Sequence, residues 1–316
     1  MGCGLWMIVG LYLDGWSHQA NKPETFFTPW HGLLYSGFGA IVIYAGLSAV
    51  RDARTGSSPA VVNDGLARLG MILFAIGGGG DFLWHTLVGI EVDIEGLISP
   101  THLLLMTGGL LMVTFPIRSA LRRGDVDAPR VVFVSAALTL GVVAFFLMYL
   151  MPWDARSSFA ITYVPESDVS NLYVVTGMAS LLACNVLFLG TVLWCARRWR
   201  APAGAATATF TAVAFGVCAL DGFDARLPIL AGVVAGVVVD ALLASGRPLP
   251  LVGLFGGFAL TSSFLALQAI EGGVGWSPSL IGGALVFATL AGYATGIAVG
   301  LSSLPSRSTA AAVPGR

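Results

Sequence analysis

Residues 131–151 read VVFVSAALTLGVVAFFLMYLM and contain no charged side chain. A helix needs about 20 consecutive apolar residues to cross the hydrocarbon core of a bilayer. Lipid cannot hydrogen-bond the backbone, so such a segment has to form a helix. The chain has ten apolar segments of this kind, at roughly 1–17, 32–50, 69–89, 102–117, 131–151, 171–196, 205–221, 227–245, 249–270 and 277–301. The predicted fold is an all-α integral membrane protein with about ten transmembrane helices.

The composition agrees with this class. Of 316 residues, 56% are hydrophobic and only 10% are charged, and the mean hydropathy is +0.84. Soluble domains carry about 25% charged residues. The net charge of −1 gives no reason to expect nucleic acid as a partner. The four cysteines form no CxxC pair, which argues against a disulfide framework and against a thiolate metal site.

The basic residues predict an orientation, because cytoplasmic loops of membrane proteins are enriched in Lys and Arg. With the N-terminus in the cytoplasm, thirteen of the sixteen basic residues fall on the cytoplasmic side. The outer loops then hold only Lys22, Arg156 and Arg226. We therefore expect both termini to lie in the cytoplasm. We expect the membrane itself to be the bacterial cytoplasmic membrane.

All four histidines of the chain lie in two copies of one motif, which reads Asp-x3-His, a spacer, then Glu-x3-(Ser/Thr)-Pro-x-His. The first copy consists of Asp14, His18, Glu24, Thr28, Pro29 and His31. The second copy consists of Asp81, His85, Glu95, Ser99, Pro100 and His102. The spacer is five residues long in the first copy and nine in the second. Internal repeats are a common build in membrane proteins, so we interpret the two copies as a duplicated helical hairpin.

Helical geometry predicts what each copy does. Asp and His four residues apart lie on one face of a helix, one turn from each other. Ser or Thr followed by Pro fits a helix start, as N-cap and first-turn residue, which places His31 and His102 in the first turn of the next helix. Each hairpin then brings one Asp and two His together at the outer membrane face.

Such a set is suited to copper, iron or zinc. The predicted metal ligands are Asp14, His18, His31, Asp81, His85 and His102. Glu24 and Glu95 are expected either to orient an imidazole or to act as additional ligands. Two other interpretations stay open: the histidines are interfacial anchors, or they bind haem axially. The aspartate beside each histidine pair favours a non-haem metal.

Three regions follow from this pattern. Residues 1–125 form a metal-binding four-helix membrane region built from the two hairpins. Residues 126–301 form a six-helix membrane region, for which the sequence indicates no function. Residues 302–316, rich in Ser, Ala and Pro, are predicted to be a disordered tail.

At these residues the chain resembles the C-type subunit of the copper membrane monooxygenases, the particulate methane and ammonia monooxygenases. That family has an Asp-x3-His-x12-His motif on adjacent helices, and Asp14, His18 and His31 have the same spacing. A second element of the family, Asn-x3-His followed by Glu-x3-Ala-Pro-x-His, is similar to the second copy. Asp81 stands where the family has Asn, and the spacer here is longer. The resemblance covers roughly residues 10–110.

The resemblance implies a copper site and an oxygen-activating enzyme or subunit that acts on a small apolar substrate arriving from the lipid. The partners it implies are other monooxygenase-like subunits or further copies of this chain, within the lipid bilayer. Two alternatives remain. One is a membrane protein of copper transport, handling or sensing, and the other is a structural subunit of a monooxygenase-like complex.

Overall fold

The structure of the protein is a computed structural model that describes residues 1–20, 27–55, 64–89 and 93–302. Within these ranges every regular element is a helix, as predicted, and there is no strand. The chain divides into two compact units. The first comprises Met1–Asp125, Val134–Phe146 and Ala219–Gly222, and the second comprises Val126–Phe133, Leu147–Cys218 and Phe223–Arg316. Of the predicted tail, residues 302–316, the structure describes only Ser302, and the rest lies outside the described residues.

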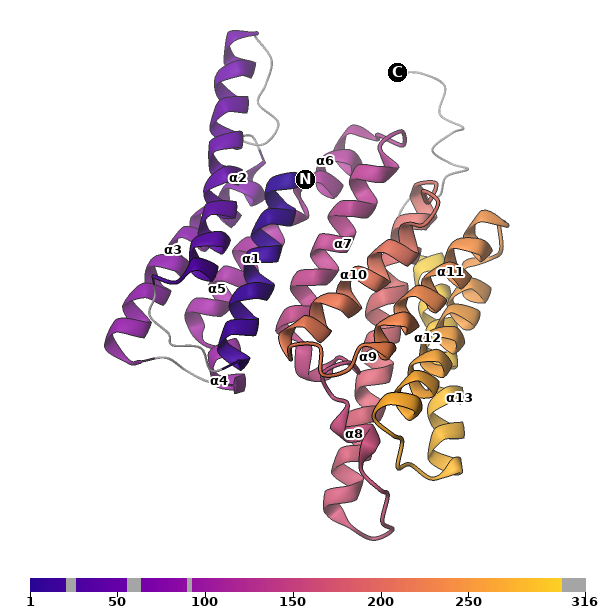
Figure 1. Ribbon diagram of the computed structural model, residues 1–316. Coiled ribbons are helices and arrows are strands. Elements are labelled where there is room, and N and C mark those ends of the chain that lie inside the picture. Colours follow the sequence, from indigo (N-terminus) through magenta and orange to yellow (C-terminus); the bar gives the residue numbers. More distant parts are fainter. Residues whose placement is uncertain (21–26, 56–63, 90–92, 303–316) are drawn as a thin grey trace. The chain divides into compact units, whose positions relative to one another are not determined.

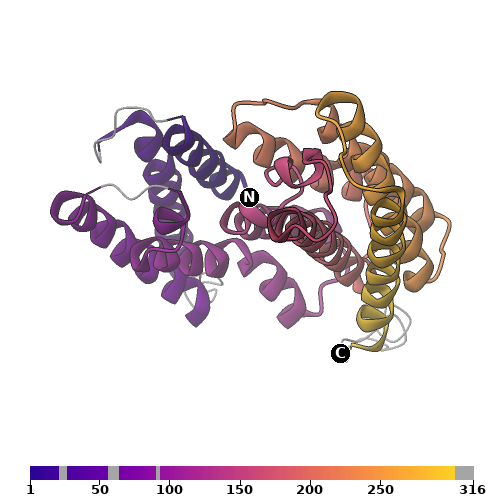
Figure 2. The same cartoon turned by 90° about the horizontal axis from the view of Figure 1, so that it is seen from below.

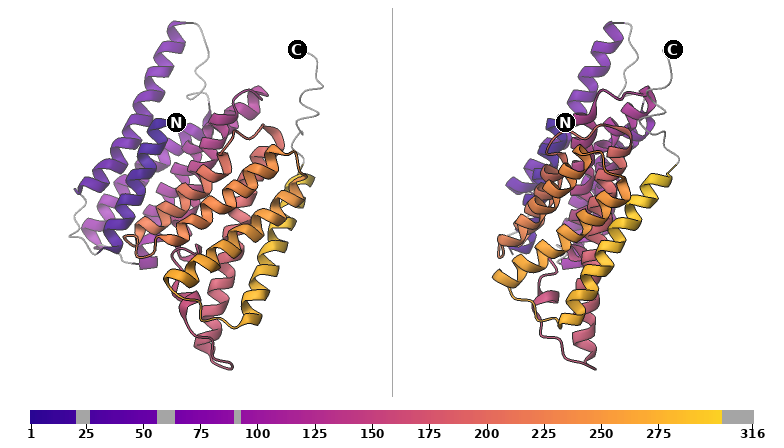
Figure 3. Two further views of the ribbon diagram at one scale, coloured as in Figure 1. Left: turned by 45° about the vertical axis from the view of Figure 1, so that its right-hand side comes forward. Right: turned by 90° about the vertical axis from the view of Figure 1, so that its right-hand side faces the viewer.

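The first unit contains the two helix pairs that carry the histidine motifs, and Figure 1 shows them in indigo to magenta. Its helices are α1 (Gly2–Gln19), α2 (Pro29–Arg54), α3 (Gly65–Leu87), α4 (Asp93–Leu97), α5 (Pro100–Val113), α6 (Phe115–Arg123) and most of α7 (Pro129–Phe146). Helix α1 packs along α2, and α3 packs along α5. Both pairs are seen again from other sides in Figure 3.

The second unit holds the remaining elements. They are η1 (Met148–Leu150), α8 (Ser157–Ala160), α9 (Asp168–Arg198), α10 (Ala205–Leu220), η2 (Leu227–Ile229), α11 (Leu230–Ala244), α12 (Leu249–Glu271) and α13 (Pro278–Leu301). Helix α12 lies beside both α11 and α13, as the view from below in Figure 2 also shows.

Each of the ten predicted apolar segments falls on a helix or a pair of consecutive helices. Eight spans among the described residues are long and apolar enough to cross a membrane, which indicates an integral membrane protein. The two that do not qualify are α1 and α10. Helix α10 has only 16 residues, and α1 ends in the polar residues Asp14, Ser17, His18 and Gln19. The count of ten spans therefore remains a prediction.

Glycines set the distance between α1 and α2. A Cβ atom added to Gly10 would lie 2.5 Å from the backbone of Leu34, and one added to Gly37 would lie 2.6 Å from the backbone nitrogen of Met7. Real Cβ atoms are not found so close to backbone, so any larger residue would push the helices apart. Small residues allow this kind of close helix packing in lipid.

Helices α3 and α5 approach each other in the same manner. A Cβ atom at Gly77 would lie 3.0 Å from the backbone nitrogen of Leu105, and one at Gly108 would lie 2.7 Å from the backbone nitrogen of Phe74. Beside these contacts lies an apolar core shared by several helices, made of Met7, Ile8, Leu34, Phe74, Leu105, Met112, Val113, Leu138 and Val142. The four helices are thereby held close together along one stretch, which limits how far apart their polar ends can be.

An ion-pair network around the buried carboxylate of Asp64 fixes the start of α3. The carboxylate of Asp64 caps the helix by accepting the backbone N–H of Ala67 at 2.8 Å, and it also binds the guanidinium groups of Arg118 and Arg122 from α6. Burial alone would raise the pKa of Asp64. The hydrogen bonds from Ala67 and Arg122 and the charge of Arg118 outweigh burial and hold that pKa below its usual range.

Helix ends in the second unit are also satisfied by side chains from other helices. Asp240 of α11 accepts the backbone N–H groups of Ala206 and Thr207 at 3.0 Å each, so it caps the start of α10. Arg197 of α9 donates to the carbonyl oxygens of Val299, at 2.7 Å, and Gly300 at the end of α13. These charged residues therefore satisfy backbone groups that a helix end leaves without partners.

The glycine contacts predict a sharp difference between two neighbouring positions. Replacing Gly37 by Ala forces a Cβ atom against the Met7 backbone and should cost about 1–3 kcal/mol of folding stability. Gly39→Ala is the matched control, because a Cβ atom there meets nothing within 4 Å. Thermal unfolding of both variants in detergent, followed by intrinsic fluorescence, measures the effect. Equal unfolding temperatures for the two variants would contradict the close contact.

Candidate metal centre

The first motif begins on α1. Asp14 and His18 lie one turn apart on this helix, as predicted, with the Oδ2 atom of Asp14 3.8 Å from the Nε2 atom of His18. Asp14 is buried, and the His18 side chain is 25% exposed. A carboxylate and an imidazole are thus presented side by side near the end of the helix.

Helix α2 contributes the third member. Thr28 is the N-cap and Pro29 the first residue of α2, as the sequence predicts, so His31 lies in the first turn. The backbone N–H of His31 donates to Thr28 Oγ1 at 3.3 Å, and the same hydroxyl hydrogen-bonds the His31 ring at Nδ1, 2.9 Å away. This double contact holds the imidazole in one orientation. Its Nδ1 atom lies 3.5 Å from Asp14 Oδ1.

The second motif forms the corresponding arrangement on α3 and α5. The Oδ1 atom of Asp81 lies 3.3 Å from Nε2 of His85 on its own helix and 3.3 Å from Nε2 of His102. Ser99 is the N-cap of α5, and its hydroxyl lies 2.9 Å from Nδ1 of His102. That Nδ1 atom also contacts the carbonyl oxygen of Gly96. Each aspartate therefore stands between two histidines.

The two motifs meet in one cluster. The His85 ring lies 6.4 Å from the His18 ring and 6.2 Å from the His31 ring, measured between centroids. Among the described residues, two groups of three have candidate ligand atoms within 4.8 Å of one another: Asp14, His18 and His31, and His31, Asp81 and His85. His31 belongs to both groups, so it joins the two halves of the cluster.

The second group differs from the predicted trio of Asp81, His85 and His102. His102 contacts Asp81 and its ring lies 6.2 Å from that of His85, but His31 is the histidine that completes the compact group. The physical reason is the packing of the two helix pairs, which brings the start of α2 against the end of α3. A pattern within one hairpin carries no information on this contact.

The structure describes only one of the two predicted glutamates. Glu24 lies outside the described residues. Glu95 is exposed on the short helix α4 and belongs to neither of the compact groups among the described residues. Whether Glu95 orients or binds a metal stays a prediction.

Tyr35 also belongs to the site, although it lies outside the repeated motif and was not among the predicted residues. Its hydroxyl donates to Asp81 Oδ2 at 3.2 Å, and its ring stacks on that of His31 with centroids 6.2 Å apart. It thus connects α2 to the carboxylate of α3. Tyr35 follows His31 by four residues, so both side chains lie on one face of α2. This spacing is the signal in the sequence from which Tyr35 could have been predicted.

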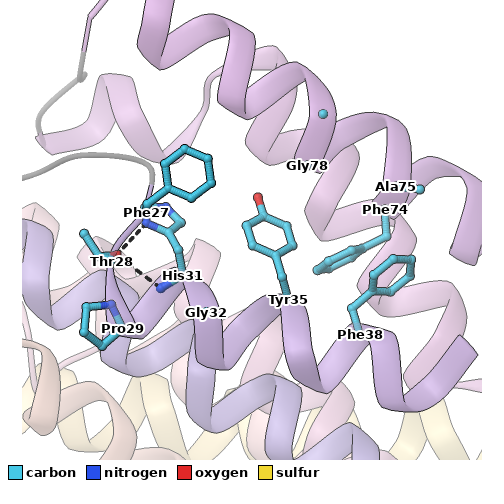
Figure 4. A pocket seen from close by; sticks show the side chains of 11 residues that line it. Phe27, Thr28, Pro29, His31, Gly32, Tyr35, Phe38, Phe74, Ala75 and Gly78 are labelled. Carbon is cyan, nitrogen blue, oxygen red and sulfur yellow. Dashed lines mark hydrogen bonds between the residues drawn. The ribbon is translucent and has the colours of Figure 1, made fainter. Parts of the chain in front are cut away.

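A pocket of 740 Å³ adjoins the cluster between α2 and α3. His31, Thr28 and Tyr35 line it together with Phe38 and Phe74. Figure 4 shows His31, Tyr35 and Phe38 following one another along α2 beside this space. The cluster is therefore reached from an apolar pocket at His31.

The donor set fits a metal of the predicted kind. It consists of carboxylate oxygen and imidazole nitrogen atoms, which suit copper, iron or zinc. The separations of 3.3–3.8 Å between a carboxylate oxygen and the Nε2 atoms of His18, His85 and His102 resemble the spacing of two ligands on one ion, about 3.4 Å for bonds of about 2.1 Å in tetrahedral geometry. Buried carboxylates are costly unless paired with positive charge, which a cation between them would supply.

The chain matches no protein-family model, no curated protein and no solved structure. What the site does is therefore inferred from its residues, the spacing of its motifs and its geometry.

The hydroxyl of Thr28 provides a test of how His31 is oriented. Thr28→Ala removes both the helix cap and the ring partner, and should cost about 1 kcal/mol of stability and weaken copper binding about 10–100-fold. Thr28→Ser keeps the hydroxyl and should retain both properties. Unfolding curves and copper titrations of the two variants measure this. A serine variant as impaired as the alanine variant would show that the hydroxyl is not the cause.

Proposed function

We propose that this protein is an integral-membrane copper protein of the monooxygenase type, which activates dioxygen and acts on an apolar substrate from the lipid. The single observation that carries the proposal is the convergence of three histidines and two aspartates in two compact groups that share His31, with His102 beside them in contact with Asp81. Copper is preferred over iron and zinc because the first motif has the spacing of the copper monooxygenases. The ligands we propose are Asp14, His18, His31, Asp81, His85 and His102.

We further propose that the site arose from a duplicated hairpin, and equivalent contacts support this. Counting from the aspartates, Gly10 of α1 corresponds to Gly77 of α3, and from the histidines, Leu34 corresponds to Leu105. Gly10 approaches Leu34 just as Gly77 approaches Leu105.

A second pair of contacts corresponds in the same way. Gly37 approaches Met7 in the first copy, and Gly108 approaches Phe74 at the equivalent positions of the second copy. The caps Thr28 and Ser99 contact their histidines at the same ring nitrogen and the same distance of 2.9 Å. A shared origin explains why both the ligands and the packing contacts recur at matching positions.

The residues have distinct tasks in this mechanism. Bound copper would supply the reduction of dioxygen and the oxidising power for attack on an unreactive C–H bond. Thr28 and Ser99 orient the imidazoles of His31 and His102, and Tyr35 holds the Asp81 carboxylate by its hydrogen bond. Phe38 and Phe74 stack with centroids 4.7 Å apart and keep the adjoining pocket apolar, which excludes water from the site.

Metal content tests the proposal. Purified in lipid after copper-replete expression, the wild-type protein should hold at least one copper per chain. His31→Ala should lose most of it, and more than His102→Ala, because only His31 belongs to both compact groups. Asp52→Asn, a carboxylate variant near the other end of α2, should keep the wild-type content. A wild-type protein without any transition metal would refute the proposal.

Activity separates an enzyme from a copper-handling protein that uses the same ligands. With a reductant and a hydrocarbon, the enzyme should consume oxygen and oxidise the hydrocarbon, and His31→Ala should abolish both. A transporter should instead move copper into sealed vesicles without net oxygen consumption. Copper uptake that depends on His31, in protein that does not oxidise any hydrocarbon, would favour transport and overturn the monooxygenase proposal.

A further inference from the structure

The pocket beside His31 is lined along one side by more than two turns of α2. Its lining begins at Phe27 and Thr28, just before α2, continues along α2 to Phe38, and includes residues from Phe74 to Gly79 of α3. At a rise of about 1.5 Å per residue, the part of α2 that lines the pocket, from Pro29 to Phe38, is about 14 Å long. The pocket therefore has the length of a chain-like molecule rather than of a compact one.

Its volume also exceeds what a small gas molecule needs. The pocket measures 740 Å³, within the range of about 300–1,000 Å³ typical of sites for drug-sized ligands. A molecule as small as water takes up about 30 Å³. The space is thus out of proportion to a substrate of one or two heavy atoms.

Polarity changes along the pocket. Thr28 and His31 lie at one end, while Phe38 and Phe74 lie at the other, as Figure 4 shows. Between them the hydroxyl of Tyr35 is hydrogen-bonded to Asp81. None of the described residues that line the pocket is Lys, Arg, Asp or Glu. The pocket is therefore built for an uncharged molecule whose length is mostly hydrocarbon.

Two glycines keep the pocket open. Gly32 of α2 and Gly79 of α3 both line it, and a Cβ atom added to either one meets no atom within 4 Å. By contrast, a Cβ atom at Gly78 would lie 2.7 Å from the Tyr35 ring. The first two glycines thus leave space that no packing contact requires.

We propose that this pocket binds an unbranched, uncharged hydrocarbon chain of medium length, with one end beside His31 and the other against Phe38 and Phe74. The proposal rests on the proposed function in taking this chain as the substrate of the copper site. A free hydrocarbon is the occupant, rather than the acyl chain of a phospholipid, because the described lining offers no cation for a phosphate group. Its terminal carbon atoms would be the part nearest the metal ligands.

Photolabelling of the purified full-length protein in lipid nanodiscs tests the pocket without any need for turnover. The probe is a ten-carbon alkane carrying a diazirine, and labelled peptides are identified by mass spectrometry. Labelling should concentrate on residues 27–38 and 74–79 and should fall when excess decane competes. Gly32→Leu and Gly79→Leu fill the open space, so each should bind the probe about tenfold more weakly.

Gly46→Leu is the matched control. It lies on α2, a Cβ atom there meets nothing within 4 Å, and it does not line the pocket. It should label like the wild-type protein. Equal labelling of all four proteins would mean that the probe only coats the lipid-facing surface, and would overturn the proposal. A second result would also overturn the proposal. It is that a phospholipid with a diazirine in its acyl chain labels the same residues and that the same two substitutions block this labelling.

Copper content of the same preparations keeps the two proposals apart. Gly32→Leu and Gly79→Leu change no proposed ligand, so they should retain wild-type copper. Specific labelling of a protein that holds no copper would support the hydrocarbon pocket and refute the copper function. Bound copper without specific labelling would support the copper site and refute the proposed hydrocarbon pocket.

Discussion

The close approach of helix backbones at four glycines is the constraint on which the first unit depends. Gly10 and Gly37 bring α1 against α2, and Gly77 and Gly108 bring α3 against α5. In lipid there is no hydrophobic driving force between helices, so tight van der Waals contact has to hold them together. Glycine makes this contact possible because it removes the atom that would separate the two backbones.

This packing is what makes a buried polar cluster possible. Asp14 and Asp81 are almost completely buried, at 7% and 1% exposure. Isolated carboxylates in such surroundings would be strongly unfavourable, and ionisable groups within membrane proteins are usually functional. Each carboxylate contacts two imidazoles at 3.3–3.8 Å, so the four helix ends form one connected polar cluster rather than a set of separate charges.

The two halves of the cluster are similar but not equal. Tyr35 of α2 reaches across to Asp81, whereas the corresponding position on α5 is Met106, which cannot donate such a hydrogen bond. His31 likewise joins the second compact group, while His102 remains at its edge. The apolar pocket lies on the side of Tyr35 and His31. Access, hydrogen bonding and ligand sharing thus all distinguish the first half from the second.

The sequence alone determined the helices, the helix starts at Thr28 and Ser99, and the pairing of each aspartate with the histidine four residues later. These features depend on apolar runs, cap residues and helical spacing, which are local properties of the chain. Only the tertiary structure decided that His31 completes the group around Asp81, that Tyr35 binds the same carboxylate, and that a pocket adjoins them. Those contacts depend on how two helix pairs pack against each other, and no spacing within one segment encodes the distance between helices that are far apart in the chain.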